Sequence, residues 1–187
     1  MLAVYLGLRT GFAVYNNSGC LTSLFSRQFT CLTELKDAIH VILNEIPQIS
    51  HVCVEGDAVL RTVWVAEVGS FAGPNQPELP VIPVSPKEWR RKMLTKREQT
   101  NGPSAKAAAR LIARQIMWRH GLTDVYYEGS LNTDSAEAVL LGYYVVHERL
   151  HWAQNTKGNG FEDTLVERYS NGNVVLPPKK KIEKTPQ

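Results

Sequence analysis

The first thirty residues alternate between apolar runs and short polar breaks, which is the pattern of consecutive β-strands. Residues 2–8 form a continuous apolar run, which predicts a central strand buried on both faces. A second run at 12–15 and an alternating segment at 21–29 flank the turn sequence of residues 16–19. The N-terminal region is therefore predicted to form an antiparallel meander of three strands.

The rest of the chain alternates helical periodicity with short apolar strands. Apolar spacing predicts helices, the first capped by Thr33 and the third by Ser104, over residues 33–45, 58–69, 104–119 and 134–151. Short strands are expected at residues 51–55, 81–84 and 125–127. Pro83 places the second of them at an edge or a strand end. A meander followed by alternating strands and helices predicts a mixed α/β sheet.

Composition places the chain among ordinary globular proteins. It has 187 residues, the size of one domain, with 43% hydrophobic and 21% charged residues. No run approaches the roughly 20 apolar residues of a membrane-spanning helix. We expect a folded domain over 1–152 and a basic, loosely ordered tail over 153–187. Three cysteines without metal-like spacing, and no signal-peptide pattern, favour a reducing compartment.

Positive charge is concentrated in one segment. Residues 87–119 hold ten basic and two acidic residues, a local charge of +8 in a chain whose formal net charge is +3. Such a block indicates a polyanionic partner, with nucleic acid first, while a solvated helix face remains the alternative. Trp89 is expected to stack on bases among the cations. The candidate nucleic-acid-binding residues are Lys87, Trp89, Arg90, Arg91, Lys92, Lys96, Arg97 and Arg110.

Three acidic residues are the candidates for catalytic chemistry. Glu55 ends a predicted strand, and the carboxyl ends of central strands are where sites gather in α/β sheets. Asp134 and Glu137, three residues apart, open the last predicted helix and share one of its faces. For the pair on its own, helix capping is the favoured explanation, with Asp134 as the N-cap and Glu137 as its partner. The pair indicates a site only if a third acid joins it.

The order of these elements resembles the RuvC-type Holliday junction resolvases of the RNase H-like superfamily. The motifs that carry the resemblance are VYLGLRTGFA at 4–13, VEG at 54–56, GPSAK at 102–106 and DSAEA at 134–138. The resemblance covers about residues 2–150. It implies a five-stranded mixed sheet flanked by helices. It also implies a Mg²⁺-dependent, structure-selective endonuclease that acts on branched DNA.

The resemblance assigns roles to individual residues. Glu55, Asp134 and Glu137 would be catalytic carboxylates that bind Mg²⁺ or Mn²⁺, and Lys106 would lie near the scissile phosphate. Such enzymes act as two-fold dimers on branched or double-stranded DNA, so a homodimer is expected. The expected location is the cytoplasm or nucleoid, or the interior of an organelle.

One position departs from the family pattern. Tyr5 occupies the place of the first catalytic aspartate, and a neutral phenol is a poor ligand for Mg²⁺. Asp57 is a weaker substitute because it falls on a turn. The sequence therefore leaves two hypotheses open, an active resolvase and an inactive pseudo-nuclease that binds DNA or serves in protein assembly. A third is a protein-interaction module that docks on an acidic partner.

Two further patterns have alternative interpretations. Residues 147–151 read HERLH and match the zinc-protease signature, in which two histidines bind the metal and the glutamate acts as a base. The poor context favours an ordinary polar helix end instead. Trp64 and Trp118 are expected in the core, as are the residues around Tyr143 and Tyr144.

Overall fold

The fold is described from a computed structural model, which covers residues 1–7, 9–46, 48–71, 78–122 and 129–152. Residues 1–155 form one compact unit, and the remaining unit lies outside the described residues, as do the predicted tail and the predicted strand at 125–127. The strands are β1 (Leu2–Leu6), β2 (Arg9–Tyr15), β3 (Leu21–Gln28), β4 (Val52–Gly56) and β5 (Val81–Pro83). The helices are α1 (Leu32–Glu45), α2 (Ala58–Phe71), α3 (Pro86–Met93), α4 (Gly102–Arg119), α6 (Thr133–Tyr144) and the π-helix η1 (Val145–Arg149).

The five strands form one mixed sheet in the order β3-β2-β1-β4-β5. β1, β2 and β3 pair antiparallel, which confirms the predicted meander, whereas β4 and β5 pair in parallel. β1 lies in the centre and is buried on both faces because nearly all of its side chains are apolar. The predicted class, a mixed five-stranded α/β sheet flanked by helices, is therefore confirmed.

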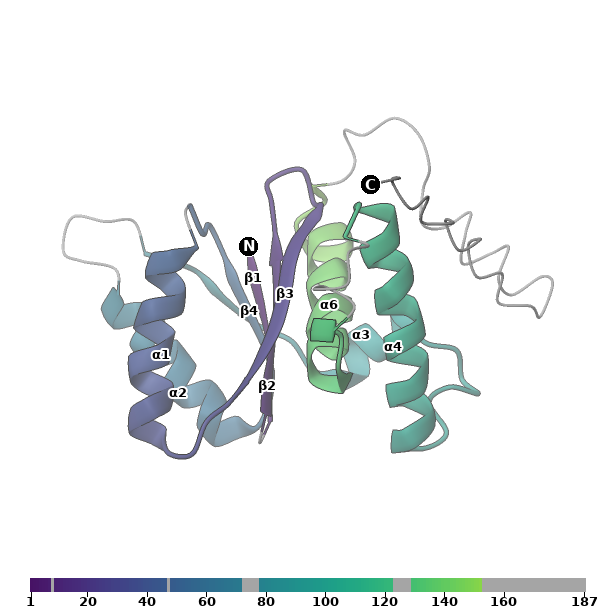
Figure 1. Ribbon diagram of the computed structural model, residues 1–187, viewed down its shortest axis with the longest axis horizontal. Helices are drawn as coiled ribbons and strands as arrows, with labels where there is room; N and C mark the ends of the chain where they lie inside the picture. The colour runs from purple at the N-terminus through teal and green to yellow at the C-terminus, as the bar shows by residue number, and fades with distance from the viewer. Residues whose placement is uncertain (8, 47, 72–77, 123–128, 153–187) are drawn as a thin grey trace, which may run out of the picture. The chain divides into compact units, whose positions relative to one another are not determined.

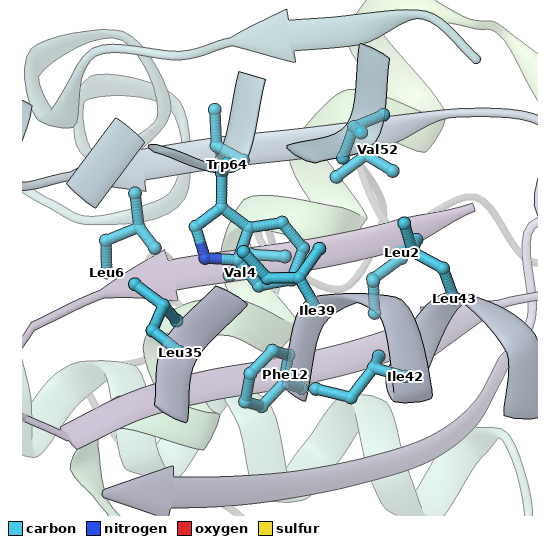
Figure 2. Packing of buried hydrophobic residues seen from close by; sticks show 12 residues of the cluster. Leu2, Val4, Leu6, Phe12, Leu35, Ile39, Ile42, Leu43, Val52 and Trp64 are labelled. Carbon is cyan, nitrogen blue, oxygen red and sulfur yellow. The ribbon is translucent and has the colours of Figure 1, made fainter. Parts of the chain in front are cut away.

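Helices cover both faces of the sheet (Figure 1). α1 and α2 lie on one side, while α6 lies against the other side with α4 outside it. Apolar side chains from β1, β2 and β4 pack between the sheet and α1–α2, as Figure 2 shows. Trp64 of α2 lies at the centre of this cluster and is fully buried, which confirms its expected place in the core. The expected burial of Tyr143 and Tyr144 in α6 is also confirmed.

Two helices begin earlier than predicted. α1 has Cys31 as its N-cap, so Thr33 lies inside the helix and is not its cap. α4 has Asn101 as its N-cap, and the Asn101 side chain accepts a hydrogen bond from the backbone N–H of Ser104 at 2.8 Å. Pro103 fits the first turn of α4 because its fixed φ is helical and that turn needs no N–H donor there. The prediction of Ser104 as the cap was wrong for this reason.

The last helix also differs from its prediction at both ends. Asn132, rather than Asp134, is the N-cap of α6, and its side chain accepts hydrogen bonds from the backbone N–H groups of Asp134 and Ser135. The box partner is Ser135, so Glu137 plays no part in capping. The α-helix ends at Tyr144, and the chain continues as the wider turn of η1. Capping therefore does not explain why Glu137 stands where it does.

Gly11 allows β2 to approach the start of α6. A Cβ atom at this position would lie 2.0 Å from the carbonyl oxygen of Asp134, which is backbone and cannot move aside. We expect Gly11→Ala to destabilise the protein by about 2–3 kcal/mol, the upper part of the range for overpacking. Chemical denaturation measures the effect. Gly69→Ala is the control: nothing lies within 4 Å of its Cβ, so it should stabilise the exposed helix by about 0.5–1 kcal/mol. Equal effects would contradict the close approach.

Within the described ranges, no helix is both long enough and apolar enough to cross a membrane.

Candidate functional site

The sheet brings two of the predicted site residues side by side. Tyr5 on β1 is paired in register with Glu55 at the end of β4, and side chains at such positions in neighbouring parallel strands lie on the same face. Glu55 is only 2% exposed, and Glu137 of α6, which covers this face, is completely buried. The charge of Glu137 acts on both Tyr5 and Glu55. Glu55, Glu137 and the half-buried Tyr5 therefore form one cluster.

Helix α3 contributes two more side chains to this cluster. Arg90 donates a hydrogen bond from Nη2 to Oε1 of Glu137 at 2.7 Å, and its guanidinium lies 5.2 Å from the centre of the Trp89 ring. Trp89 is fully buried and donates from Nε1 to Oε2 of Glu55 at 3.4 Å. The prediction that Trp89 stacks on bases is therefore wrong. Arg90 is bound to an internal carboxylate, and this leaves its predicted role in nucleic-acid binding without support.

Burial controls the protonation of the cluster. The pKa of Glu55 is raised to about 7, mainly by burial and to a smaller extent by the negative charge of Glu137. The hydrogen bond from Trp89 and the charge of Arg90 act in the opposite direction but do not cancel the burial. Burial and the Glu137 carboxylate also raise the pKa of Tyr5 well above its usual range. Tyr5 is therefore a neutral phenol at every physiological pH.

The cluster does not fit a divalent metal. One oxygen of Glu137 is held by Arg90, Glu55 faces an indole N–H, and Tyr5 offers a protonated oxygen. Mg²⁺ and Mn²⁺ prefer several charged oxygen ligands with free lone pairs. The Tyr5 hydroxyl also hydrogen-bonds to the Glu137 carboxylate, while Oε2 of Glu137 is buried with no partner of standard hydrogen-bond geometry among the described residues. A metal would have to displace the guanidinium first.

No hydrogen bond or ion pair links the other two residues of the predicted catalytic set, Asp134 and Lys106, to this cluster in the described part of the chain. Asp134 is half-buried on the first turn of α6, and its side chain has no hydrogen bond or ion pair with any described residue. Lys106 is exposed on α4 and, within the same ranges, forms no ion pair with a carboxylate. No group of three or more His, Cys, Asp and Glu side chains suited to a metal occurs in the described part of the chain.

Two more ion pairs tie α3 to η1. Lys92 Nζ lies 2.9 Å from Glu148 Oε2, and Arg149 pairs with Glu88. Lys92 was predicted to bind nucleic acid, but in the structure its charge is already matched. Together with the buried pair between Arg90 and Glu137, these contacts fix α3 against α6 and η1. Two of the four cations on α3, Arg90 and Lys92, are therefore engaged in ion pairs within the chain, the first buried and the second at the surface.

The geometry of η1 also accounts for the sequence HERLH, which matched the zinc-protease signature. In η1 the π-helical turn replaces the α-helical spacing that would place two histidines on one face. His147 stacks on Tyr143 with ring centres 3.9 Å apart, and burial lowers its pKa to about 4. Glu148 is occupied by Lys92, and His151 is exposed with a positive φ of 53°. The residues serve packing and ion pairing, in agreement with the ordinary interpretation.

The remaining cations form a free basic surface on α3, α4 and the turn between them. Each is exposed and has no ion-pair partner among the described residues; they are Lys87, Arg91, Lys96, Arg97, Lys106, Arg110 and Arg114. An open pocket of about 350 Å³ joins the two helices, and it is lined by Pro86, Lys87, Arg90, Gln99, Asn101, Gly102 and Ala105. No acidic side chain lines this pocket. The basic residues of α3 and α4 therefore belong to neighbouring surfaces.

Trp118 is the residue that sequence reasoning misplaced most. It was expected in the core, but its side chain is 53% exposed near the end of α4. The buried residues of α4 are instead Ala109, Ile112 and Ile116, among others, which repeat at helical spacing. Trp118 lies off that spacing, four residues after Arg114. Attention to the position on the helix, rather than to the residue type, would have found it.

Comparison with known proteins adds no identity. The chain matches no family model and no curated protein. The function therefore has to be inferred from the cluster, the basic surface and the fold themselves.

Proposed function

We propose that this chain is a RuvC-like nucleic-acid-binding protein with an RNase H-like fold, which binds branched or double-stranded DNA without cutting it. The observation that carries the proposal is the ion pair between Arg90 and Glu137, 2.7 Å long, inside the carboxylate cluster. An internal guanidinium supplies the positive charge that a catalytic metal would otherwise supply. The chain then keeps the fold and the basic surface of a junction resolvase without its metal chemistry.

The arrangement of the acids supports the RuvC-like part of the proposal. Glu55 ends the strand beside β1, Glu137 lies on the helix that covers this face, and Tyr5 stands at the position of the first aspartate. A mixed sheet with three antiparallel strands followed by two parallel ones is compatible with an RNase H-like layout. A structural ion pair alone would not require Glu55 to lie at the end of a central strand and Glu137 to lie on the helix that covers it.

The free basic surface supports DNA as the partner. Its cations have no acids among their ion-pair partners in the described residues, so their charge is available to phosphates. Phosphate contacts by lysine and arginine release counterions and dominate non-specific affinity for DNA. Compartment remains a proposal: the cytoplasm, nucleoid or an organelle interior would each provide DNA. The homodimer that the resemblance implies is part of the same proposal.

A second candidate function is favoured by one observation. Oε2 of the fully buried Glu137 has no partner of standard hydrogen-bond geometry in the described part of the chain, and Glu55 lies near it. If Arg90 moved away, these carboxylates would be the residues to bind Mg²⁺ or Mn²⁺ in a structure-selective endonuclease. A third reading, a protein-assembly module, would use the basic surface to dock an acidic protein.

Junction binding tests the proposal. We expect the protein to bind a labelled four-way junction, with an affinity that falls steeply as salt increases. Arg91→Gln and Lys96→Gln should each reduce the slope of log affinity against log salt by about one, because each removes one phosphate contact. Lys36→Gln is the control; it removes the same charge from α1, on the opposite side of the sheet. Equal slopes in all variants would contradict the assigned surface.

The same samples distinguish the other two candidates. With Mg²⁺ or Mn²⁺ added, we expect no cleavage of the junction by the native chain. Cleavage that disappears in Glu55→Gln would establish the endonuclease and overturn the inactive assignment. Absence of DNA binding at low salt would leave the protein-assembly reading.

A further inference from the structure

Helix α4 carries a row of exposed side chains that the function described so far does not explain. Lys106, Arg110, Arg114 and Trp118 follow one another at intervals of four residues, and all four are exposed. Residues at this spacing are neighbours on a helix surface, and the row extends about 18 Å at 1.5 Å per residue. The row therefore consists of three cations followed by one indole.

The charge on α4 has one sign. The helix contains no aspartate or glutamate, and Lys106, Arg110 and Arg114 have no ion-pair partner among the described residues. The opposite side of the helix packs on α6, which Figure 1 shows between α4 and the sheet. The row consequently faces away from the core. Its charge is complementary to a polyanion.

The exposed indole of Trp118 favours one class of polyanion over the others. Trp118 is 53% exposed, whereas Trp64 and Trp89 are fully buried. An exposed tryptophan beside arginines offers a flat surface on which a base stacks, and phosphates of the same strand reach the neighbouring cations. A polyanion without bases, or an acidic peptide, would use the cations but would gain nothing specific from the ring.

From this juxtaposition we infer that α4 is a contact helix for nucleic acid with unpaired bases, and that Trp118 stacks on one of these bases. The inference rests on the proposed function and makes it more specific. The partner is DNA with unstacked nucleotides, as at a branch point or in a single strand. Trp118 thereby takes the role that the sequence suggested for Trp89.

Tryptophan fluorescence of the full chain tests the inference directly. Stacking on a base quenches indole emission, and the fully buried Trp64 and Trp89 do not respond to a ligand on α4. Trp152 is half-buried with its ring edge-on to His51, so the quenching is assigned to Trp118 by its loss in the Trp118 variant. We expect a single-stranded oligonucleotide to quench the native protein more than a blunt duplex of equal length does. Trp118→Leu should abolish this quenching and weaken binding by roughly 5- to 100-fold. Trp118→Phe should keep most of the affinity, since phenylalanine also stacks.

Two comparisons make the outcome unambiguous. Arg114→Gln should lower the salt dependence but leave the quenching at saturation, because it removes a phosphate contact and not the ring. Heparin, a polyanion without bases, should bind without quenching Trp118. Equal quenching by heparin, or unchanged oligonucleotide affinity and quenching in Trp118→Leu, would overturn the inference. DNA binding measured with a labelled junction would then still stand, so this failure is distinct from a failure of the proposed function.

Discussion

Replacing Arg90 by methionine is expected to lower the free energy of unfolding by about 3–5 kcal/mol. The substitution leaves the carboxylate of Glu137, which is fully buried, without its 2.7 Å partner. Removing one member of a buried ion pair is strongly destabilising because the other charge keeps its desolvation cost. Urea denaturation followed by circular dichroism measures the effect. Arg91→Met is the matched control on the same helix; Arg91 is exposed, so its replacement should cost less than about 0.5 kcal/mol.

A double variant separates the ion pair from the packing around it. In Arg90→Met/Glu137→Met both charges are gone, and we expect most of the lost stability to return, since an apolar pair of similar volume is often as stable as a buried ion pair. A single Arg90→Met variant as stable as Arg91→Met would show that Glu137 finds another partner. In that case Arg90 would not be needed to offset the charge of Glu137, and the observation that carries the inactive assignment would fail.

The contribution of Glu55 to stability is expected to fall as pH rises from about 4.5 to about 7, whereas the lowered pKa of His147 acts in the opposite direction over nearly the same range. Burial raises the pKa of Glu55 in the folded protein to about 7, whereas in the unfolded chain the group has its ordinary value of 4.5. Between these values the folded state binds more protons than the unfolded state does. The stabilisation by the neutral carboxyl is complete below pH 4.5 and is lost as pH passes the folded pKa. At 1.36 kcal/mol per pKa unit, Glu55 alone contributes about 3 kcal/mol to this difference.

The isosteric variant isolates that contribution. Glu55→Gln keeps the shape and cannot ionise, so its free energy of unfolding should lack this loss between pH 4.5 and 7. Comparing the two proteins removes the contributions of all other titrating groups. Parallel stability curves for Glu55→Gln and the native chain would mean that Glu55 is already ionised at low pH. The cluster would then carry two negative charges against the single charge of Arg90.

The predictions for Arg90 and for Glu55 both concern the cluster around the buried Glu137 carboxylate. The guanidinium of Arg90 and the indole of Trp89 come from α3, and the pairs between α3 and η1 hold that helix in place. The buried pair thus has a positioning role, because α3 cannot shift without exposing the charge of Glu137. This same helix carries Lys87 and Arg91 of the basic surface. The buried ion pair therefore also positions the helix that carries these two exposed cations.

Much of the fold could be predicted from local patterns. The continuous apolar run of β1 and the alternation in β3 identified the meander, because strand periodicity is a direct consequence of burial. Helix starts were less predictable because several residues compete as caps. Asn101 and Asn132 are the N-caps, in place of the predicted Ser104 and Asp134, because their side chains accept hydrogen bonds from backbone N–H groups. Glu55 and Glu137 were identified from their places at element ends, and the structure brings them together.

The sequence by itself determined the mixed sheet, the position of its acids and the concentration of positive charge between residues 87 and 119. Only the tertiary structure decided which of those charges are free. Charge and aromaticity are properties of one residue, whereas pairing and exposure depend on what packs against it. Trp89 is covered and Trp118 is exposed because α3 turns its indole toward Glu55, while α4 packs its other side on α6. For the same reason Arg90 belongs to the buried cluster rather than to the surface.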